Sequence, residues 1–121
     1  MSIEHTLLIL DDRADVRRGV QRFMSLFVSQ VFVAGTPEEA EAVLREHAPE
    51  FLLCDYWLGP EHPPGTALVE RWRHDFPCLA RVALMTGTKA TAILPAQGVD
   101  RIFQKPLRLA EVKDWFLGDG A

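Results

Sequence analysis

Short apolar runs alternate along this chain with segments whose apolar residues recur every three or four positions. The runs are HTLLIL (5–10), QVFVA (30–34), FLLC (51–54), RVALM (81–85) and DRIFQ (100–104). Continuous apolar runs of this length are typical of strands that are buried on both faces of a parallel sheet. We therefore predict five strands over these residues.

The segment after the first run predicts a helix. Its apolar residues follow one another at spacings of four, three and four, and they are Val16, Val20, Phe23 and Phe27. This spacing places all four on one buried helical stripe, with Arg17, Arg18 and Gln21 facing outward.

Four more helices are predicted by caps and periodicity. Thr36 is predicted to be an N-cap, because Pro37 follows at the first helical position and Glu39 lies three residues after the cap. A helix is therefore expected from there to about His47. The other three span about 66–75, 89–98 and 107–117, with the buried residues Leu68, Val69 and Trp72 in the first and Leu109, Val112 and Phe116 in the last. Pro95 should interrupt or kink the helix over 89–98.

Five strands that alternate with five helices through short loops specify a doubly wound α/β sandwich with a parallel sheet. The 121 residues suffice for one domain, so residues 1–121 are expected to fold as a unit. No internal repeat or linker divides them.

Composition and charge exclude several classes of function. The formal charge is −4, and no dense block of lysine and arginine is present, so neither nucleic acid nor an anionic membrane is an expected partner. No apolar stretch approaches the ~20 residues of a membrane span, and the N-terminus lacks a signal-peptide pattern, so a cytoplasmic location is expected. Cys54, inside an apolar run, is expected to be a small core residue.

The residues that end the apolar runs carry the candidate chemistry. Asp11 and Asp12 follow the first run, Asp55 the third, Thr86 the fourth, and Lys105 the fifth. In an open parallel sheet, ligands bind beyond the carboxyl ends of the strands, so groups that end different strands can share one site.

These residue types match phosphoryl transfer to a carboxylate. Mutual repulsion among three carboxylates is tolerable when a hard cation such as Mg²⁺ lies between them. Asp55 can attack phosphorus, Lys105 can neutralise the transferred group, and the Thr86 hydroxyl can donate to it. Singly, each has a simpler explanation: Asp12 as a helix cap, Asp11 as a solvated acid, and Lys105 as a surface lysine.

In this order and context, the residues resemble the receiver domain of two-component response regulators. The loop after Asp55 and the MTG sequence at 85–87 look most like receivers of hybrid histidine kinases and of stand-alone single-domain regulators. The resemblance implies a flavodoxin-like fold with strand order 2-1-3-4-5, and a Mg²⁺ site of Asp11, Asp12, Asp55 and the main-chain carbonyl of Trp57. It also implies a cis peptide bond between Lys105 and Pro106.

The implied reaction is transfer of a phosphoryl group to Asp55 from a phosphohistidine of a sensor kinase or phosphotransfer protein. Such a domain is an acceptor rather than an enzyme. It signals through contacts with a downstream protein or a covalently linked domain, and a weak homodimer is a further option. Whether the chain is a stand-alone regulator or part of a longer protein stays open.

Some features depart from the family pattern. Gly65 lies ten residues after Asp55 instead of eight, and Ile102 occupies the position, three residues before the lysine, where receivers usually carry the aromatic switch partner of Thr86. With the short helix at 89–98, Ile102 favours an alternative, a phosphorylation-independent scaffold. The Trp57 indole is expected either near the phosphoryl group or simply covering the loop.

Two further classes fit less well. A phosphohydrolase of the haloacid dehalogenase type needs an Asp-x-Asp pattern at the end of its first strand, which LDDR at 10–13 does not supply. A flavin carrier needs a phosphate-binding loop after the first strand, whereas DDRADV at 11–16 is acidic.

Overall fold

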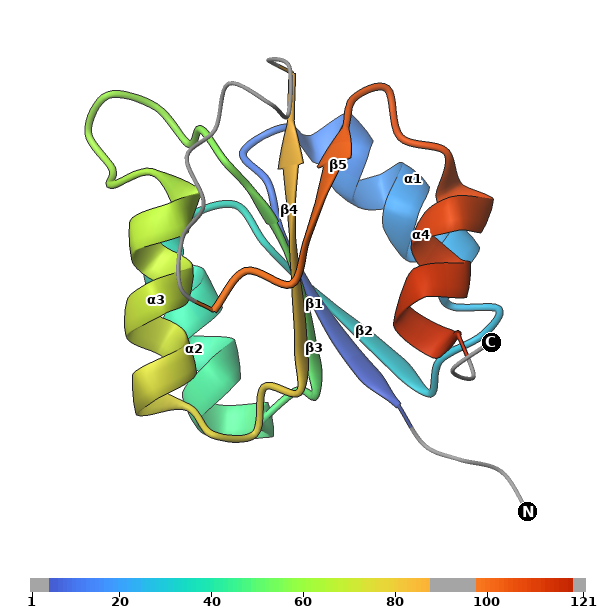
Figure 1. Ribbon diagram of the computed structural model, residues 1–121, viewed down its shortest axis with the longest axis horizontal. Helices are drawn as coiled ribbons and strands as arrows, with labels where there is room; N and C mark the ends of the chain where they lie inside the picture. Colours follow the sequence, from blue (N-terminus) through green and yellow to red (C-terminus); the bar gives the residue numbers. More distant parts are fainter. Residues whose placement is uncertain (1–4, 88–97, 119–121) are drawn as a thin grey trace.

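The computed structural model describes residues 5–87 and 98–118, and five parallel strands form its sheet. The strands are β1 (Thr6–Leu10), β2 (Gln30–Ala34), β3 (Phe51–Asp55), β4 (Arg81–Thr86) and β5 (Arg101–Gln104). Their order is β2-β1-β3-β4-β5, and every neighbouring pair is parallel (Figure 1). The predicted doubly wound α/β fold and strand order are confirmed.

Four helices are described, and they cover the two faces of the sheet. They are α1 (Ala14–Met24), α2 (Pro37–His47), α3 (Gly65–Asp75) and α4 (Leu109–Leu117). Helices α2 and α3 lie on one face, and α1 and α4 on the other (Figure 1). The helix predicted over 89–98 lies outside the described residues except for Gly98, because 88–97 are not among them. None of the described helices is long and apolar enough to cross a membrane.

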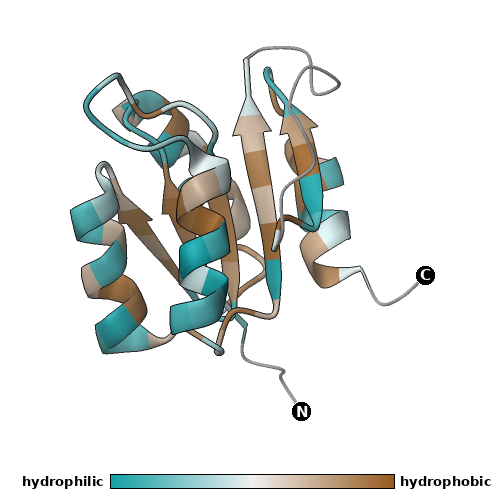
Figure 2. Ribbon diagram, turned by 60° about the vertical axis from the view of Figure 1, so that its left-hand side comes forward, coloured by the Kyte–Doolittle hydropathy of each residue, from teal (hydrophilic) through white to brown (hydrophobic). Residues whose placement is uncertain are grey.

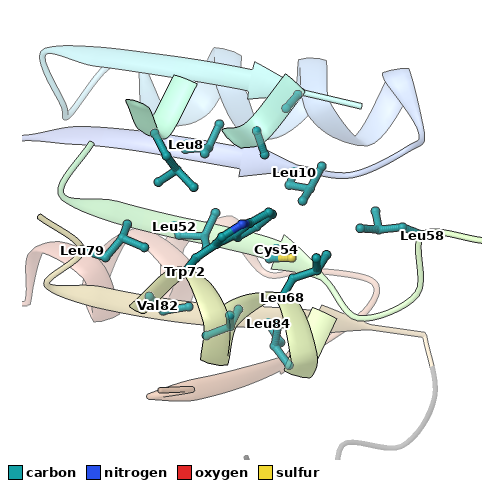
Figure 3. Close-up of a cluster of buried hydrophobic side chains, with 14 residues drawn as sticks. Leu8, Leu10, Leu52, Cys54, Leu58, Leu68, Trp72, Leu79, Val82 and Leu84 are labelled. Atoms are coloured by element: carbon teal, nitrogen blue, oxygen red, sulfur yellow. The ribbon is translucent and has the colours of Figure 1, made fainter. Parts of the chain in front are cut away.

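The core is divided by the sheet into two layers. On the side of α2 and α3, Trp72 is fully buried against Leu52 and Val82 and their neighbours (Figure 3). Its indole N–H donates to the Glu41 carboxylate of α2 at 3.0 Å, which satisfies the one polar atom of a side chain that otherwise contributes burial. Figure 2 shows the pattern behind this packing, with hydrophobic strands inside and polar helix surfaces outside. Cys54 is buried in the same layer, as predicted.

The end of α1 differs from the prediction. Phe27 does not continue the buried stripe: the helix ends at Met24, and the Phe27 side chain is 43% exposed. The reason is a tightening of the backbone, because the amide of Leu26 bonds to the carbonyl of Phe23, and that of Phe27 to Met24, three residues back instead of four. Met24 and Val28 are buried in place of Phe27.

The start of α2 follows the predicted cap. The Thr36 hydroxyl accepts a hydrogen bond from the Glu39 amide at 3.2 Å, and Pro37 occupies the first helical position. The Glu39 carboxylate in turn accepts from the amide of Gly35 at 2.8 Å, which ties the turn after β2 to the helix.

Candidate functional site

The predicted site residues meet at one edge of the sheet because parallel strands end there together. Main-chain hydrogen bonds continue past the last residues of the strands: Asp11 donates to Ala34 at 3.1 Å, Tyr56 to Met85 at 2.8 Å and Lys105 to Thr86 at 2.7 Å. These bonds fix the backbone from which the functional side chains leave.

Asp11 lies at the bottom of the site and is fully buried. Its Oδ2 accepts a hydrogen bond from Nζ of Lys105 at 2.9 Å, and its Oδ1 accepts one from the main-chain amide of Arg13 at 2.9 Å. A buried carboxylate requires such partners, because an uncompensated charge away from water is costly.

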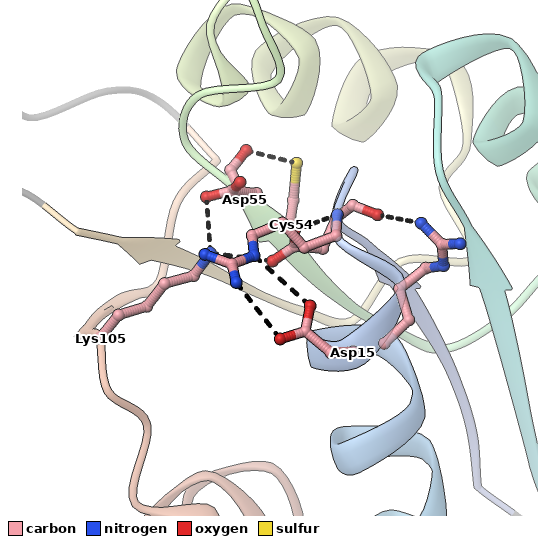
Figure 4. Close-up of polar contacts among 7 residues, drawn as sticks. Asp15, Cys54, Asp55 and Lys105 are labelled. Carbon is pink, nitrogen blue, oxygen red and sulfur yellow. Dashed lines mark hydrogen bonds and ion pairs between the residues drawn. The ribbon is translucent and has the colours of Figure 1, made fainter.

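Lys105 joins the acids of two strands. Its ammonium lies 2.9 Å from Asp11 and 3.4 Å from Oδ1 of Asp55 (Figure 4). Burial alone would lower the pKa of Lys105, but its hydrogen bond with Asp11 and the charges of both acids raise the pKa above its ordinary value. The side chain is therefore a fixed cation beside Asp55.

Asp55 is a buried carboxylate with an altered affinity for protons. Burial, reinforced by the negative charge of Asp11, raises its pKa from 3.8 to about 6, although Lys105 opposes the change. At neutral pH the side chain is mostly ionised, so it can act as a nucleophile. The adjacent Cys54 thiol donates to the Asp55 carbonyl at 3.3 Å, and burial raises its pKa far above the physiological range.

The three carboxylates suit a hard cation. Asp11, Asp12 and Asp55 each offer an oxygen, and these oxygens lie within 4.8 Å of one another. Asp12 and Asp55 line a surface cavity of about 660 Å³, whereas Asp11 lies behind it. Mg²⁺ prefers a few carboxylates together with water and phosphate oxygens, and the cavity leaves room for both. The residues present therefore fit Mg²⁺.

The remaining predicted residues lie at different distances from the chemistry. Thr86 is buried at the cavity wall, and Trp57, 56% exposed, lies at its rim. Ile102 does not line the cavity; it is half-buried against the core layer under α2 and α3. The peptide bond between Lys105 and Pro106 is cis, as the sequence resemblance implied.

Gly65 closes the loop that follows Asp55. Its amide donates to the Tyr56 carbonyl at 2.7 Å, and a Cβ at this position would lie 2.6 Å from the main-chain oxygen of Asp55. A side chain at Gly65 would collide with the backbone of the acid. The loop is thus two residues longer than the receiver pattern and still returns to Asp55 through a glycine.

Two arginines next to the acidic pair were not recognised from the sequence. Arg17, expected to face outward, is half-buried and donates from Nη1 to the main-chain carbonyl of Asp11 at 2.7 Å. Arg13 lines the cavity and forms an exposed ion pair with Asp15 at 3.3 Å. The helical period could have separated Arg17 from the exposed Arg18 beside it, because at about 100° per residue Arg17 flanks the apolar stripe, whereas Arg18 lies opposite it.

Comparison of the sequence with protein-family models and with curated proteins finds no match. The structure is similar to several solved structures over nearly its whole length. One is a response regulator from Thermotoga maritima, with a TM-score of 0.82 and 20% sequence identity, covering 96% of this chain and 97% of that one. Another is a response regulator receiver domain (CheY-like) from Methylobacillus flagellatus, with a TM-score of 0.82 and 15% identity, covering 96% and 98%.

A third similar structure is a response regulator receiver domain protein (CheY-like) from Methanospirillum hungatei JF-1. Its TM-score is 0.74 at 20% identity, and the match covers 96% of this chain and 93% of that one. The chain therefore has the fold of the CheY-like receiver domains of response regulators.

Proposed function

We propose that this chain is a phosphoacceptor receiver domain of a two-component system, in which Asp55 accepts a phosphoryl group with Mg²⁺ bound beside it. The observation that carries the proposal is the arrangement around Asp55. A buried carboxylate has an ammonium 3.4 Å away on one side and two further acids within reach of a shared cation. A structural ion pair needs no such cavity, and Asp55 opens into one.

The reaction requires little beyond positioning and neutralisation of charge. A carboxylate oxygen of Asp55 attacks the phosphorus of a phosphohistidine, the P–N bond breaks, and its electron pair leaves with the imidazole nitrogen, which then takes up a proton. An acyl phosphate forms on Asp55. Lys105 neutralises the charge of the phosphoryl group, and the Thr86 hydroxyl donates to one of its oxygens. Asp11, Asp12, Asp55 and the Trp57 carbonyl would hold Mg²⁺, which supplies the opposing positive charge.

The donor in this proposal is a sensor histidine kinase or a histidine phosphotransfer protein. The domain acts as an acceptor that takes part in its own phosphorylation, and its output is a contact with a further protein or a linked domain. The cytoplasmic location expected from the sequence belongs to the same proposal.

A phosphorylation-independent scaffold is the second candidate function. Ile102 favours this candidate. Receivers usually carry an aromatic ring at this position that moves together with the Thr86 hydroxyl, whereas Ile102 has no ring and lies away from the cavity. The two candidates differ in their response to fluoroberyllate, a mimic of the phosphoryl group. A receiver should show backbone NMR shift changes at Thr86 and in the loop 56–64, whereas a scaffold should show none.

Labelling with acetyl phosphate and Mg²⁺ tests the proposal directly. The wild-type protein should gain the mass of one phosphoryl group, and the modified peptide should contain Asp55. Asp55→Asn should abolish the labelling, whereas Asp15→Asn, at an exposed acid outside the cavity, should preserve it. Labelling that persists in Asp55→Asn, or no labelling of the wild type, would overturn the assignment.

A further inference from the structure

Arg17 makes a contact that its neighbours on α1 do not share. Its guanidinium reaches back from the helix to the end of β1 and donates to the carbonyl oxygen of Asp11 at 2.7 Å. Arg18, the next residue, is exposed. A guanidinium is well suited to such a contact, because it is always charged and presents its donors in a rigid planar fork.

The carbonyl that Arg17 holds belongs to the peptide plane between Asp11 and Asp12. Because that plane is rigid, fixing its oxygen fixes the direction in which the chain continues to Asp12. The amide of Asp11 is already bonded to Ala34 at 3.1 Å, and its carboxylate to Lys105 and to the amide of Arg13. With Arg17, each polar atom of Asp11 has a partner, and the peptide that carries Asp12 cannot rotate without breaking one of these bonds.

The turn after β2 leaves space for the guanidinium. A Cβ built on Gly35 would lie 3.0 Å from Nη1 of Arg17, tighter than ordinary van der Waals contact. The amide of Gly35 is held by Glu39 at 2.8 Å, so the turn cannot easily move away. The backbone of Gly35 is not in the left-handed region, so alanine is compatible with it. An alanine there would push the Arg17 guanidinium while leaving its charge in place.

We propose that Arg17 is a positioning residue for the acidic pair. Its bond to the Asp11 carbonyl keeps Asp12 oriented toward Asp55 and thereby sets the affinity for Mg²⁺, and Gly35 provides the space that this bond requires. The inference rests on the Mg²⁺ site of the proposed function. It assigns a role to a residue that contacts neither the cation nor the phosphoryl group.

A purely electrostatic role for Arg17 predicts the opposite change in Mg²⁺ affinity, so the direction of that change tests the proposal. A positive charge near the site repels Mg²⁺, so a purely electrostatic Arg17 would lower the affinity, and Arg17→Gln would raise it. If Arg17 acts by positioning, Arg17→Gln should weaken Mg²⁺ binding by about tenfold, the lower end of the effect of removing a group that orients metal ligands. Arg17→Lys, which keeps a donor, should recover part of the loss.

The experiment is a Mg²⁺ titration followed by the amide NMR signals of Asp12 and Asp55. Gly35→Ala should weaken binding in the same direction as Arg17→Gln, and the double variant should bind no more weakly than Arg17→Gln alone, because both changes act on one contact. Arg18→Gln is the matched control and should not weaken binding. In the metal-free protein, the Asp12 amide signal should move in Arg17→Gln and Gly35→Ala but not in Arg18→Gln.

Urea denaturation of the same variants separates positioning from a general structural role. One outcome is that the Arg17→Gln variant unfolds at lower urea concentration and still binds Mg²⁺ with wild-type or higher affinity. That result would overturn the inference and leave the proposed function intact. A wild-type protein that binds no Mg²⁺ would overturn both. Weakening in Arg17→Gln without any in Gly35→Ala would refute the role assigned to Gly35.

Discussion

Replacing Asp55 by asparagine should stabilise the metal-free protein at neutral pH. Burial and the charge of Asp11 raise the pKa of Asp55 from 3.8 to about 6. At about 1.4 kcal/mol for each tenfold change in an equilibrium constant, ionising Asp55 in the folded protein costs about 3 kcal/mol more than in the unfolded chain. Asparagine removes that charge, and the raised pKa already includes the opposing attraction of Lys105, so the expected gain in the free energy of unfolding is about 3 kcal/mol.

The gain should depend on pH in a defined direction. A carboxyl group whose pKa is raised by folding binds more protons in the folded than in the unfolded state between the two pKa values. The stability of the wild type therefore decreases as the pH rises from about 4 to above 6, through the raised pKa of Asp55. Asp55→Asn lacks this dependence, so the two proteins should have similar stability below pH 4 and differ most above pH 7.

Urea denaturation followed by tryptophan fluorescence, from pH 4 to pH 8 without divalent ions, measures this difference. Asp15→Asn is a control in which the change in stability should have the opposite sign. The hydrogen bond with Arg13 lowers the pKa of Asp15, so neutralising the Asp15 side chain should slightly destabilise the protein. Mg²⁺ should reduce the advantage of Asp55→Asn by stabilising the wild type. A variant at pH 7 that is no more stable than the wild type would refute the electrostatic argument.

Two further substitutions test the geometry of the site. Gly65→Ala should destabilise the fold by about 1–3 kcal/mol in urea denaturation, since its Cβ would lie 2.6 Å from the Asp55 carbonyl oxygen, whereas Gly87→Ala, with nothing within 4 Å, should be nearly neutral. Equal stability of these two variants would contradict the close approach. Lys105→Gln should slow labelling by acetyl phosphate by about a hundredfold and should tighten Mg²⁺ binding, because it removes a cation that contacts both Asp11 and Asp55. An unchanged initial rate would exclude a role for the ammonium in the transfer.

Much of the fold is predictable from the sequence for a simple physical reason. A strand buried on both faces needs a continuous apolar run. The runs that end at Leu10, Cys54 and Met85 therefore predict strands directly. The position of the site is predictable from the same strands, because parallel strands bring their carboxyl ends to one edge of the sheet. The order in which the strands pair required the resemblance to receiver domains, since periodicity contains no information about neighbours.

The tertiary structure decided the features that depend on contacts between distant residues. Phe27 lies on the helical stripe by spacing, yet the chain tightens after Met24 and exposes it. The helical period places Arg17 at the flank of the apolar stripe, but only the direction of α1 relative to β1 brings its guanidinium to the Asp11 carbonyl.

The properties of Asp55 were also decided by tertiary structure. The sequence identifies it as a carboxylate at the end of a buried strand. Its raised pKa arises from burial and from Asp11, 44 residues earlier, and is limited by Lys105, 50 residues later. Local patterns determine strands and helices because the hydrophobic period acts over a few residues, whereas the charge state and orientation of a site depend on groups that only the folded chain brings within a few ångströms.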